Sequence, residues 1–433
     1  MIRAIDIIRK KQEKEELTEE ELRFFVEGVT DGTLPDYQIS AFLMAVYFNG
    51  MTKKETILLA QHMAKSGDVM DLSAIKGIKG DKHSTGGIGD KTSLIVVPLL
   101  AECGIKVAKM SGRALGYTGG TVDKLESIPG MRLQLEKEEF FHIVDQCGAS
   151  IISQTGNICP ADKRLYQLRD VTGTVASLPL IAASIMSKKL AAGADIILLD
   201  VKMGGGAFMK TKEEAFQLAE IMVEIGKASG KKTIAVITNM DIPLGNAVGN
   251  MLEIAEAVHT LKGNGPEDIT ELCIKLSGMM VASAKDIPSA DAEEEVRRII
   301  ASGRAVGRFA KMVEMQGGNG EWVRQPEYFP KAKFQETVTA EADGYICMEA
   351  EKYGETANIL GAGRLAKDSG IDRLAGLVLY AKSGEFVKKG DAIAALHSSK
   401  LSCLKEGRAF FESHLKIAET CTLSKELIYG TVE

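Results

Sequence analysis

Apolar residues in the first 66 positions recur at the three- and four-residue spacing of amphipathic helices, and no segment there alternates as a strand would. The run from Thr18 to Glu21 combines a capping hydroxyl with first-turn acids, and Leu22 and Phe25 follow it on one helical face. Thr52 stands at the same kind of boundary, before another helix. The pattern predicts a small helical unit without strands.

From about residue 70 the pattern changes to short apolar runs that alternate with helical segments. Lys106 to Met110, Asp195 to Val201 and Thr233 to Ile237 have the length and β-branched content of buried strands. Thr92 to Cys103 is an apolar helical run that ends at a glycine. This alternation predicts a mainly parallel sheet covered by helices.

A second helical stretch, residues 161–193, interrupts this alternation of strands and helices. We expect it to pack back on the N-terminal helices. The last hundred residues contain short strands and two charged stretches, Ser399 to Glu406 and Glu412 to Glu419, which we expect to be helical. The predicted class is α/β, with a small discontinuous helical domain hinged to a large α/β domain and a strand-rich α+β C-terminal domain. The expected domains are residues 1–66 with 161–193, residues 67–160 with 194–330, and residues 331–433.

Length and composition narrow the class of protein. A chain of 433 residues is expected to form two or three domains. Its content of 45% hydrophobic and 26% charged residues is typical of globular proteins. A formal net charge of -6 argues against nucleic acid or an anionic membrane as a partner, and no run of about 18 apolar residues is present to span a membrane. The seven cysteines form no Cys-x-x-Cys pair, and the first residues lack a signal-peptide core, so we expect a cytoplasmic protein.

Two glycine-rich loops predict an anion site. One runs from Lys82 to Asp90 and the other from Ser111 to Thr121, separated by one helix and one strand, so both should lie at the same edge of a sheet. Glycines let backbone N–H groups approach an anion closely. Neither loop has P-loop or dinucleotide-binding spacing, which favours free phosphate or a sugar phosphate and no organic cofactor. The polar side chains available are Lys82, Ser84, Ser93, Lys109, Ser111 and Thr121.

A polar cluster is expected on the second helical stretch. Ser184 and Lys188 are four residues apart and Tyr166 and Arg169 are three apart, so each pair shares a helix face. The alternative is a solvated face, which is the favoured interpretation for Lys188 and Lys189 taken alone. No covalent nucleophile emerges, so phosphate itself is expected to attack.

His83 lies inside the first glycine loop. A histidine in this position can donate a hydrogen bond to a ligand or act as an acid, or it can serve only as a structural hydrogen-bonding group.

The residues from Ser111 to Glu126 resemble the signature of the thymidine and pyrimidine-nucleoside phosphorylases. The stretches Lys82–Asp90, Asp162–Asp170 and Ser184–Lys189 are similar to that family as well, as are the residues from Asp200 through the following glycines and Gly361 to Arg364. The resemblance implies a homodimer with the domain layout above. It also implies phosphorolysis of uridine, thymidine and deoxyuridine to the free base and an α-pentose 1-phosphate, with inversion.

The resemblance also implies residue roles. The implied catalytic residues are His83, Arg169 and Lys188. The implied ligands of phosphate, which is the co-substrate, are Lys82, His83, Ser84, Ser93, Lys109, Met110, Ser111 and Thr121. The implied ligands of the pyrimidine nucleoside are Tyr166, Arg169, Ser184 and Lys188.

Substrate breadth and a cation site rest on finer features of the resemblance. Lys109 and the run Pro243 to Ala247 are similar to the broad-specificity form, whereas Tyr117 departs from the family's frequent histidine. Some broad members hold a monovalent cation, potassium in our expectation, and a lysine at position 91 still allows backbone ligation. The implied cation ligands are Gly89, Lys91, Leu244, Ala247 and Glu256.

Three alternatives remain open at this point. One is a thymidine-restricted phosphorylase. Another is an anthranilate-type phosphoribosyltransferase, which has a similar layout but needs magnesium and a diphosphate site, for which no acidic pair is placed. The third is a carrier protein, indicated by the turn from Val387 to Asp391, although the carrier lysine motif is absent.

Overall fold

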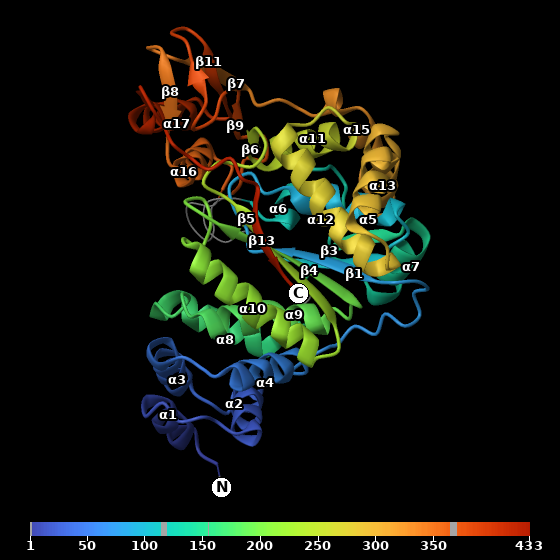
Figure 1. The fold of residues 1–433 in the computed structure, drawn as a ribbon, viewed down its shortest axis with the longest axis vertical. Helices are drawn as coiled ribbons and strands as arrows, with labels where there is room; N and C mark the ends of the chain where they lie inside the picture. The colour runs from blue at the N-terminus through green and yellow to red at the C-terminus, as the bar shows by residue number, and fades with distance from the viewer. Residues whose placement is uncertain (1, 114–118, 155, 364–369) are drawn as a thin grey trace.

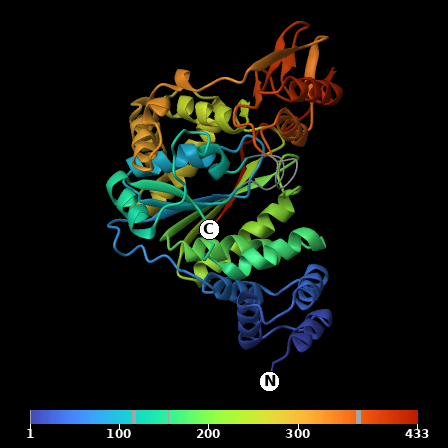
Figure 2. The ribbon, with the colours of Figure 1, turned by 180° about the vertical axis from the view of Figure 1, so that it is seen from behind.

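The structure is a computed structural model and describes residues 2–113, 119–154, 156–363 and 370–433. N-terminal helices form one end of the molecule, a helix-covered sheet forms the middle, and a strand-rich C-terminal unit forms the opposite end (Figure 1). The view from behind shows the same order of layers (Figure 2). The α/β class with a helical unit at one end is therefore confirmed.

The helical end combines two separate parts of the chain. Thr18 and Thr52 each form a capping box, so both predicted helix starts are confirmed. The second helical stretch packs on the first and shares one apolar core with it, which holds residues such as Phe42, Leu59 and Met186. The helices are α1 (Ala4–Gln12), α2 (Glu19–Asp31), α3 (Asp36–Asn49), α4 (Lys53–Ala64), α8 (Pro160–Thr172) and α9 (Leu178–Ala191).

The central sheet has the order β1-β4-β5-β13, in which the first three strands are parallel. Strands β2 and β3 form a separate parallel pair. A parallel bridge between Lys79 and Lys106, the residues just before β1 and β2, places the starts of these two strands side by side. The strands are β1 (Gly80–Ser84), β2 (Val107–Ser111), β3 (Ala149–Ser153), β4 (Ile196–Met203), β5 (Lys232–Asn239) and β13 (Ile428–Val432).

Alternate residues of the central strands enter two different cores. Leu198 and Val236 pack into the core built by the later helices, whereas Leu199 and Ala235 pack toward α9 and α10. This period of two is what a sheet covered on both faces requires. The remaining elements of this part are α5 (Thr92–Glu102), α6 (Thr121–Leu125), α7 (Lys137–Cys147), α10 (Lys212–Ala228), β6 (Ala247–Val248), α11 (Asn250–Leu261), α12 (Glu267–Lys285), α13 (Ser289–Ala301), α14 (Arg304–Met315), α15 (Gly320–Arg324) and a 3₁₀ turn (Pro326–Tyr328).

The C-terminal unit contains two small antiparallel sheets, one ordered β10-β8-β12 and one ordered β6-β9-β11-β7. Because β6 pairs with β9, the α/β part contributes a strand to this unit. Its elements are β7 (Phe334–Thr339), β8 (Gly344–Cys347), α16 (Ala350–Leu360), β9 (Gly376–Leu379), β10 (Phe386–Val387), β11 (Ala392–Ser398), α17 (Leu401–His414) and β12 (Lys416–Ala418).

The end of the chain differs from the sequence prediction in two ways. One continuous helix, α17, replaces the first predicted charged helix and the start of the second, and residues 416–418 form β12. The last strand, β13, leaves the C-terminal unit and pairs antiparallel with β5. Ile428 and Val432 pack against the two cores of the central part, so this strand covers an otherwise open sheet edge.

Within the described residues, no helix is both long enough and apolar enough to cross a membrane.

Candidate active site

The two glycine-rich loops begin at the ends of β1 and β2, which lie side by side but belong to separate sheets, so the prediction of one shared sheet edge is only partly confirmed. Lys109, near the end of β2, reaches across to β1 and donates a hydrogen bond to the backbone carbonyl of Lys82. The same ammonium lies 3.5 Å from a carboxylate oxygen of Asp81. Burial is the main cause that lowers the pKa of Lys109 to about 8.

Asp90 organises the first loop. Its carboxylate accepts hydrogen bonds from the Ser84 hydroxyl and, at 2.6 Å, from the Thr92 hydroxyl. Its backbone carbonyl accepts from Lys124 Nζ at 2.6 Å. Burial alone would raise the pKa of Asp90, but the ammonium groups of Lys82, Lys202 and Lys124 hold it well below its ordinary value. The carboxylate is therefore ionised and fixes the loop between the end of β1 and the start of α5.

Lys82 points into the protein interior. Its ammonium lies 3.0 Å from a carboxylate oxygen of Asp200 and donates to the Thr92 hydroxyl, with no exposed side-chain surface. Asp200 also pairs with Lys202 at 2.9 Å and accepts from the Thr238 hydroxyl at 2.6 Å. Burial alone would lower the pKa of Lys82, but Asp200 and Asp90 raise it above its ordinary value. A direct contact of this ammonium with phosphate stays a prediction.

His83 is a neutral group surrounded by cations. Burial, followed by the charges of Lys189, Lys109, Lys82 and Lys188, lowers the pKa of His83 well below its ordinary value. Its Nε2 atom is buried and has no hydrogen-bond partner among the described residues. A neutral imidazole can donate or accept one hydrogen bond here, and the protonated form needed for an acid role is disfavoured near neutral pH.

The other predicted phosphate ligands lie at the ends of elements around the two loops. Ser93 is buried in the first turn of α5, Met110 and Ser111 end β2, and Thr121 is the first residue of α6. Tyr117 lies outside the described residues. The phosphate roles of these side chains stay predictions.

The predicted base cluster comes together on α8 and α9. Lys188 Nζ donates to the Ser184 hydroxyl at 2.9 Å and forms an ion pair with Asp162. The guanidinium of Arg169 lies 5.8 Å from the centre of the Tyr166 ring. Burial is the main cause that raises the pKa of Tyr166 and lowers the pKa of Arg169, and the charge of Asp162 opposes the lowering at Arg169.

The cluster keeps hydrogen-bonding capacity for a ligand. Arg169 uses three of its five N–H donors on the backbone carbonyls of Thr174, Val175 and Leu180. Lys188 uses two of its three donors on Ser184 and Asp162. Within the described part of the chain, two guanidinium donors and one ammonium donor are thus left for acceptor atoms of a bound molecule.

Lys189 ties this cluster to the phosphate loops. Its ammonium lies 2.7 Å from Asp81 of β1, and both side chains are buried. The interpretation of Lys188 and Lys189 as solvated surface lysines is therefore wrong. This ion pair holds the start of β1 against α9, and it lies only two residues from His83. The charge of Lys188, also on α9, contributes to the lowered pKa of His83.

The five residues expected to bind potassium meet at one place, but they do not fit a bound cation. Lys91 Nζ lies among the expected ligands and donates to the backbone carbonyls of Leu244 at 2.9 Å and Ala247 at 3.0 Å. It also lies 2.5 Å from a carboxylate oxygen of Glu256. Burial alone would lower the pKa of Lys91, but Glu256 and then Glu253 raise it above its ordinary value. The lysine supplies the positive charge itself.

Sequence reasoning missed most of the charged residues that support the site. Asp90, Asp200 and Lys202 lie inside stretches that the resemblance includes, but no spacing rule indicates that they share one buried network. A signal was available in Lys82 and Asp200, which have opposite charges and lie near the ends of the neighbouring parallel strands β1 and β4. Such strand ends meet at one sheet edge, so an ion pair between them could have been expected. The supporting residues without an assigned role were Asp81, Asp90, Thr92, Lys124, Asp162, Asp200 and Lys202.

Comparison with known proteins agrees with this architecture. Residues 76–306 match the a/b domain of the glycosyl transferase family, and residues 5–67 match its helical bundle domain. Residues 346–418 match the pyrimidine nucleoside phosphorylase C-terminal domain. An anthranilate phosphoribosyltransferase from Thermus thermophilus has a similar fold, with a TM-score of 0.60 at 20% identity over 72% of this chain and 99% of that one. These matches define a member of the glycosyl transferase family with a helical bundle domain, an a/b domain and an added C-terminal domain.

Full-length relatives narrow the family further. The chain is 47% identical over 433 residues to a pyrimidine-nucleoside phosphorylase of Geobacillus stearothermophilus, covering 100% of both chains. It is 50% identical over 401 residues to the enzyme of the same name from Bacillus subtilis (strain 168), covering 92% of this chain and 93% of the relative. The chain therefore belongs to the pyrimidine-nucleoside phosphorylase family, and it is an enzyme of the pentosyltransferase class.

Proposed function

We propose that this enzyme phosphorolyses uridine, thymidine and deoxyuridine to the free base and an α-pentose 1-phosphate. The observation that carries the proposal is the buried Nε2 atom of His83, which has no hydrogen-bond partner among the described residues and feels the charges of four lysines. Such a place favours an anion beside a neutral hydrogen-bonding group, which is what phosphate next to a nucleoside presents. Phosphate is the co-substrate in this proposal, and no organic cofactor is required.

In the proposed reaction, phosphate attacks the anomeric carbon while the glycosidic C–N bond breaks. The electron pair of that bond moves onto the pyrimidine, and its negative charge spreads to the ring oxygens. The free donors of Arg169 and Lys188 stabilise this charge, which is electrostatic catalysis by preorganised groups. Ser184 and Tyr166 hold the ring, and the glycine loops with Lys82, Ser84, Ser93, Lys109, Met110, Ser111 and Thr121 hold phosphate.

The stereochemistry of the product tests this reaction. Attack opposite the departing base converts a β-nucleoside into an α-sugar phosphate. We expect ³¹P and ¹H NMR of a reaction with uridine and phosphate to show only α-ribose 1-phosphate. A β-anomer would contradict direct displacement, and free ribose would indicate hydrolysis.

The phosphate role of Lys109 predicts a pH dependence. Its pKa is lowered to about 8, so the ammonium is present below that pH and is lost as the pH rises through it. We expect kcat/KM for phosphate to fall by about one decade per pH unit above this value, because the free enzyme loses an anion-binding charge. The measurement is a pH profile of kcat/KM for phosphate.

Lys109→Arg is the matched variant for this profile, because a guanidinium stays charged across the whole range. We expect the high-pH decline to disappear in this variant. A decline of the same shape in both proteins would mean that another group causes it.

We also propose that the phosphate and base ligands belong to separate domains that close on the substrates and exclude water. The divisions are residues 1–66 with 161–193 against residues 67–160 with 194–330. The buried Lys189–Asp81 pair crosses this boundary. It supports a closure in which the two domains rotate about this contact and stay joined there.

A homodimer and a cytoplasmic location complete the proposal. Large apolar side chains are exposed on α1 and α3, namely Ile5, Tyr37, Tyr47 and Phe48, and they support an interface at the helical end. Sedimentation velocity would test this, since a single-chain mass would contradict it. The free thiols of all seven cysteines support a reducing compartment.

A further inference from the structure

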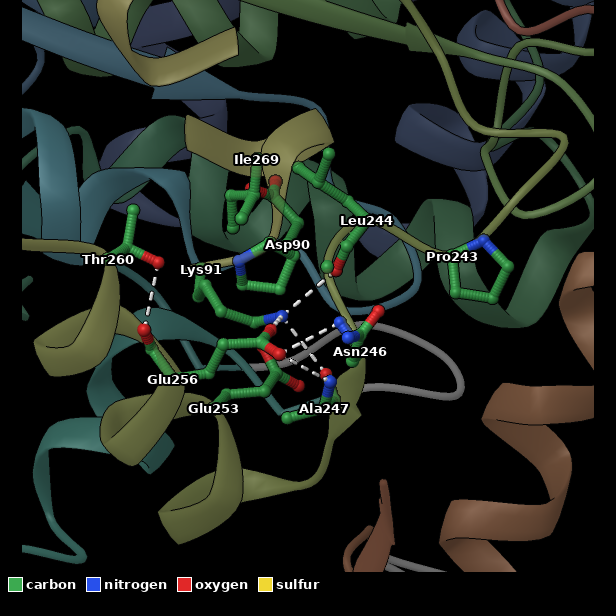
Figure 3. A network of polar contacts seen from close by, with 12 residues as sticks. Asp90, Lys91, Pro243, Leu244, Asn246, Ala247, Glu253, Glu256, Thr260 and Ile269 are labelled. Carbon is green, nitrogen blue, oxygen red and sulfur yellow. Dashed lines mark hydrogen bonds and ion pairs between the residues drawn. The ribbon is translucent and has the colours of Figure 1, made fainter. Parts of the chain in front are cut away.

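The buried ammonium of Lys91 joins three segments that are far apart in the sequence. Lys91 follows Asp90 in the first glycine loop, Leu244 and Ala247 lie just before and within β6, and Glu256 is on α11. Figure 3 shows the ammonium between the two carbonyl oxygens and the carboxylate, with the dashed contacts converging on it. The side chain of Lys91 has no exposed surface.

The number of donors equals the number of acceptors at this point. An ammonium has three N–H donors, and Leu244 O, Ala247 O and one Glu256 oxygen each accept one. The other Glu256 oxygen accepts backbone N–H groups of Asn246 at 2.8 Å and Ala247 at 3.1 Å. One positive charge and one negative charge are thus both fully hydrogen-bonded, and a second cation on the same oxygens would be repelled by the ammonium.

The backbone is packed closely around this ammonium. A Cβ atom on Gly89 would lie 2.5 Å from the carbonyl oxygen of Leu244, and one on Gly245 would lie 2.9 Å from Lys91 Nζ. Both glycines have positive φ angles, +70° and +66°, which favour glycine. Even one extra carbon atom at either position would clash with these groups.

The contacts connect the phosphate loop to the C-terminal unit. Leu244 donates its N–H to Ile88 O at 3.1 Å, and Asn246 O accepts from Leu379 N of β9 at 2.8 Å. A second buried lysine, Lys124, bonds the Asp90 carbonyl and pairs at 2.7 Å with Glu253 on α11. The loop that carries Ser84 is therefore held by two lysines that pair with acids of one helix.

We propose that Lys91 is a tethered cation, a positioning residue whose ammonium takes the place of a bound potassium ion and makes this enzyme independent of monovalent cations. The covalent ammonium holds the first glycine loop against the segment 244–247 at every salt concentration. No ion has to bind before the loop adopts the shape that the proposed phosphate site needs.

The wild-type enzyme gives the first test. Its thermal unfolding midpoint and its KM for phosphate are measured in potassium chloride and in tetramethylammonium chloride at equal ionic strength, because the latter cation is too large for such a site. We expect both quantities to be the same in the two salts. A midpoint or a KM that improves in a saturable way with potassium would overturn the proposal.

A pair of variants gives the second test. Lys91→Ser removes the ammonium and leaves Glu256 and two carbonyls around the vacated space, where carbonyl oxygens can replace the hydration shell of potassium. In tetramethylammonium chloride we expect a lower midpoint and a KM for phosphate raised about tenfold or more, since a group that orients a site typically costs this much. Potassium should restore both values.

Lys91→Met is the matched control, because its apolar side chain fills the same space and provides no room for an ion. We expect it to be impaired in both salts. Equal behaviour of the two variants, or a serine variant that needs no potassium, would contradict the proposal. The unfolding midpoint does not depend on the reaction, so a failure of the proposed function leaves this readout intact.

Discussion

We expect the replacement of Lys188 by glutamine to lower kcat by about 10²–10³-fold, the cost of removing one preorganised donor from a developing negative charge. Glutamine keeps hydrogen-bonding atoms near Ser184 and Asp162 but has no charge, so the fold is retained while the stabilisation of the departing base is lost. Because that charge exists only in the transition state, kcat and kcat/KM should fall together. Steady-state kinetics with varied nucleoside measures both.

Lys163→Gln is the control for this substitution. Lys163 is on the neighbouring helix α8 and is exposed, so its loss should leave kcat within about twofold of wild type, as expected for a surface change. Wild-type kinetics in the Lys188 variant would remove the base cluster from the account. A rise in KM with unchanged kcat would mean that Lys188 only helps to bind the ground state.

We expect the replacement of Asp200 by asparagine to destabilise the protein by about 3–5 kcal/mol, since it leaves buried ammonium groups without their counter-charge. Lys82 lies 3.0 Å and Lys202 lies 2.9 Å from this carboxylate, and all three side chains have no exposed surface. Lys82→Met should cost less, because Asp200 then still pairs with Lys202. We expect the urea concentration at the unfolding midpoint to be highest for the wild type, lower for Lys82→Met and lowest for Asp200→Asn.

The control for this series is Glu224→Gln on α10. Glu224 pairs with Lys53 at 2.6 Å, but both side chains are substantially exposed, so we expect a change within about 0.5 kcal/mol. An Asp200 variant as stable as this control would show that the buried network does not hold the sheet edge together.

Local signals in the sequence were sufficient for most of the fold. The capping boxes at Thr18 and Thr52 depend on residues three positions apart, so they could be identified directly. The buried strand β4 could be predicted because it begins with the apolar run from Ile196 to Leu199, whose residues face cores on both sides. The closeness of β1 and β2 could be predicted from the order of strand, helix and strand, but their placement in two separate sheets could not.

Features that depend on distant partners could not be predicted. Strand β13 pairs with β5, which lies far away in the sequence, and the composition of β13 gives no indication of that partner. The network of Asp90, Lys82 and Asp200 depends on which way each side chain turns, and Lys82 turns inward. Lys91 was expected to offer its backbone to a cation, but its long side chain carries its own charge to the same oxygens.

We expect this enzyme to cleave the glycosidic bond of pyrimidine nucleosides only with phosphate, to which it transfers the pentose. The most direct measurement is the initial rate of free-base release from uridine and from thymidine, each with and without phosphate. We expect release from both nucleosides only when phosphate is present. Release from thymidine alone would contradict the broad specificity, and release without phosphate, or none from either nucleoside, would contradict the proposed function.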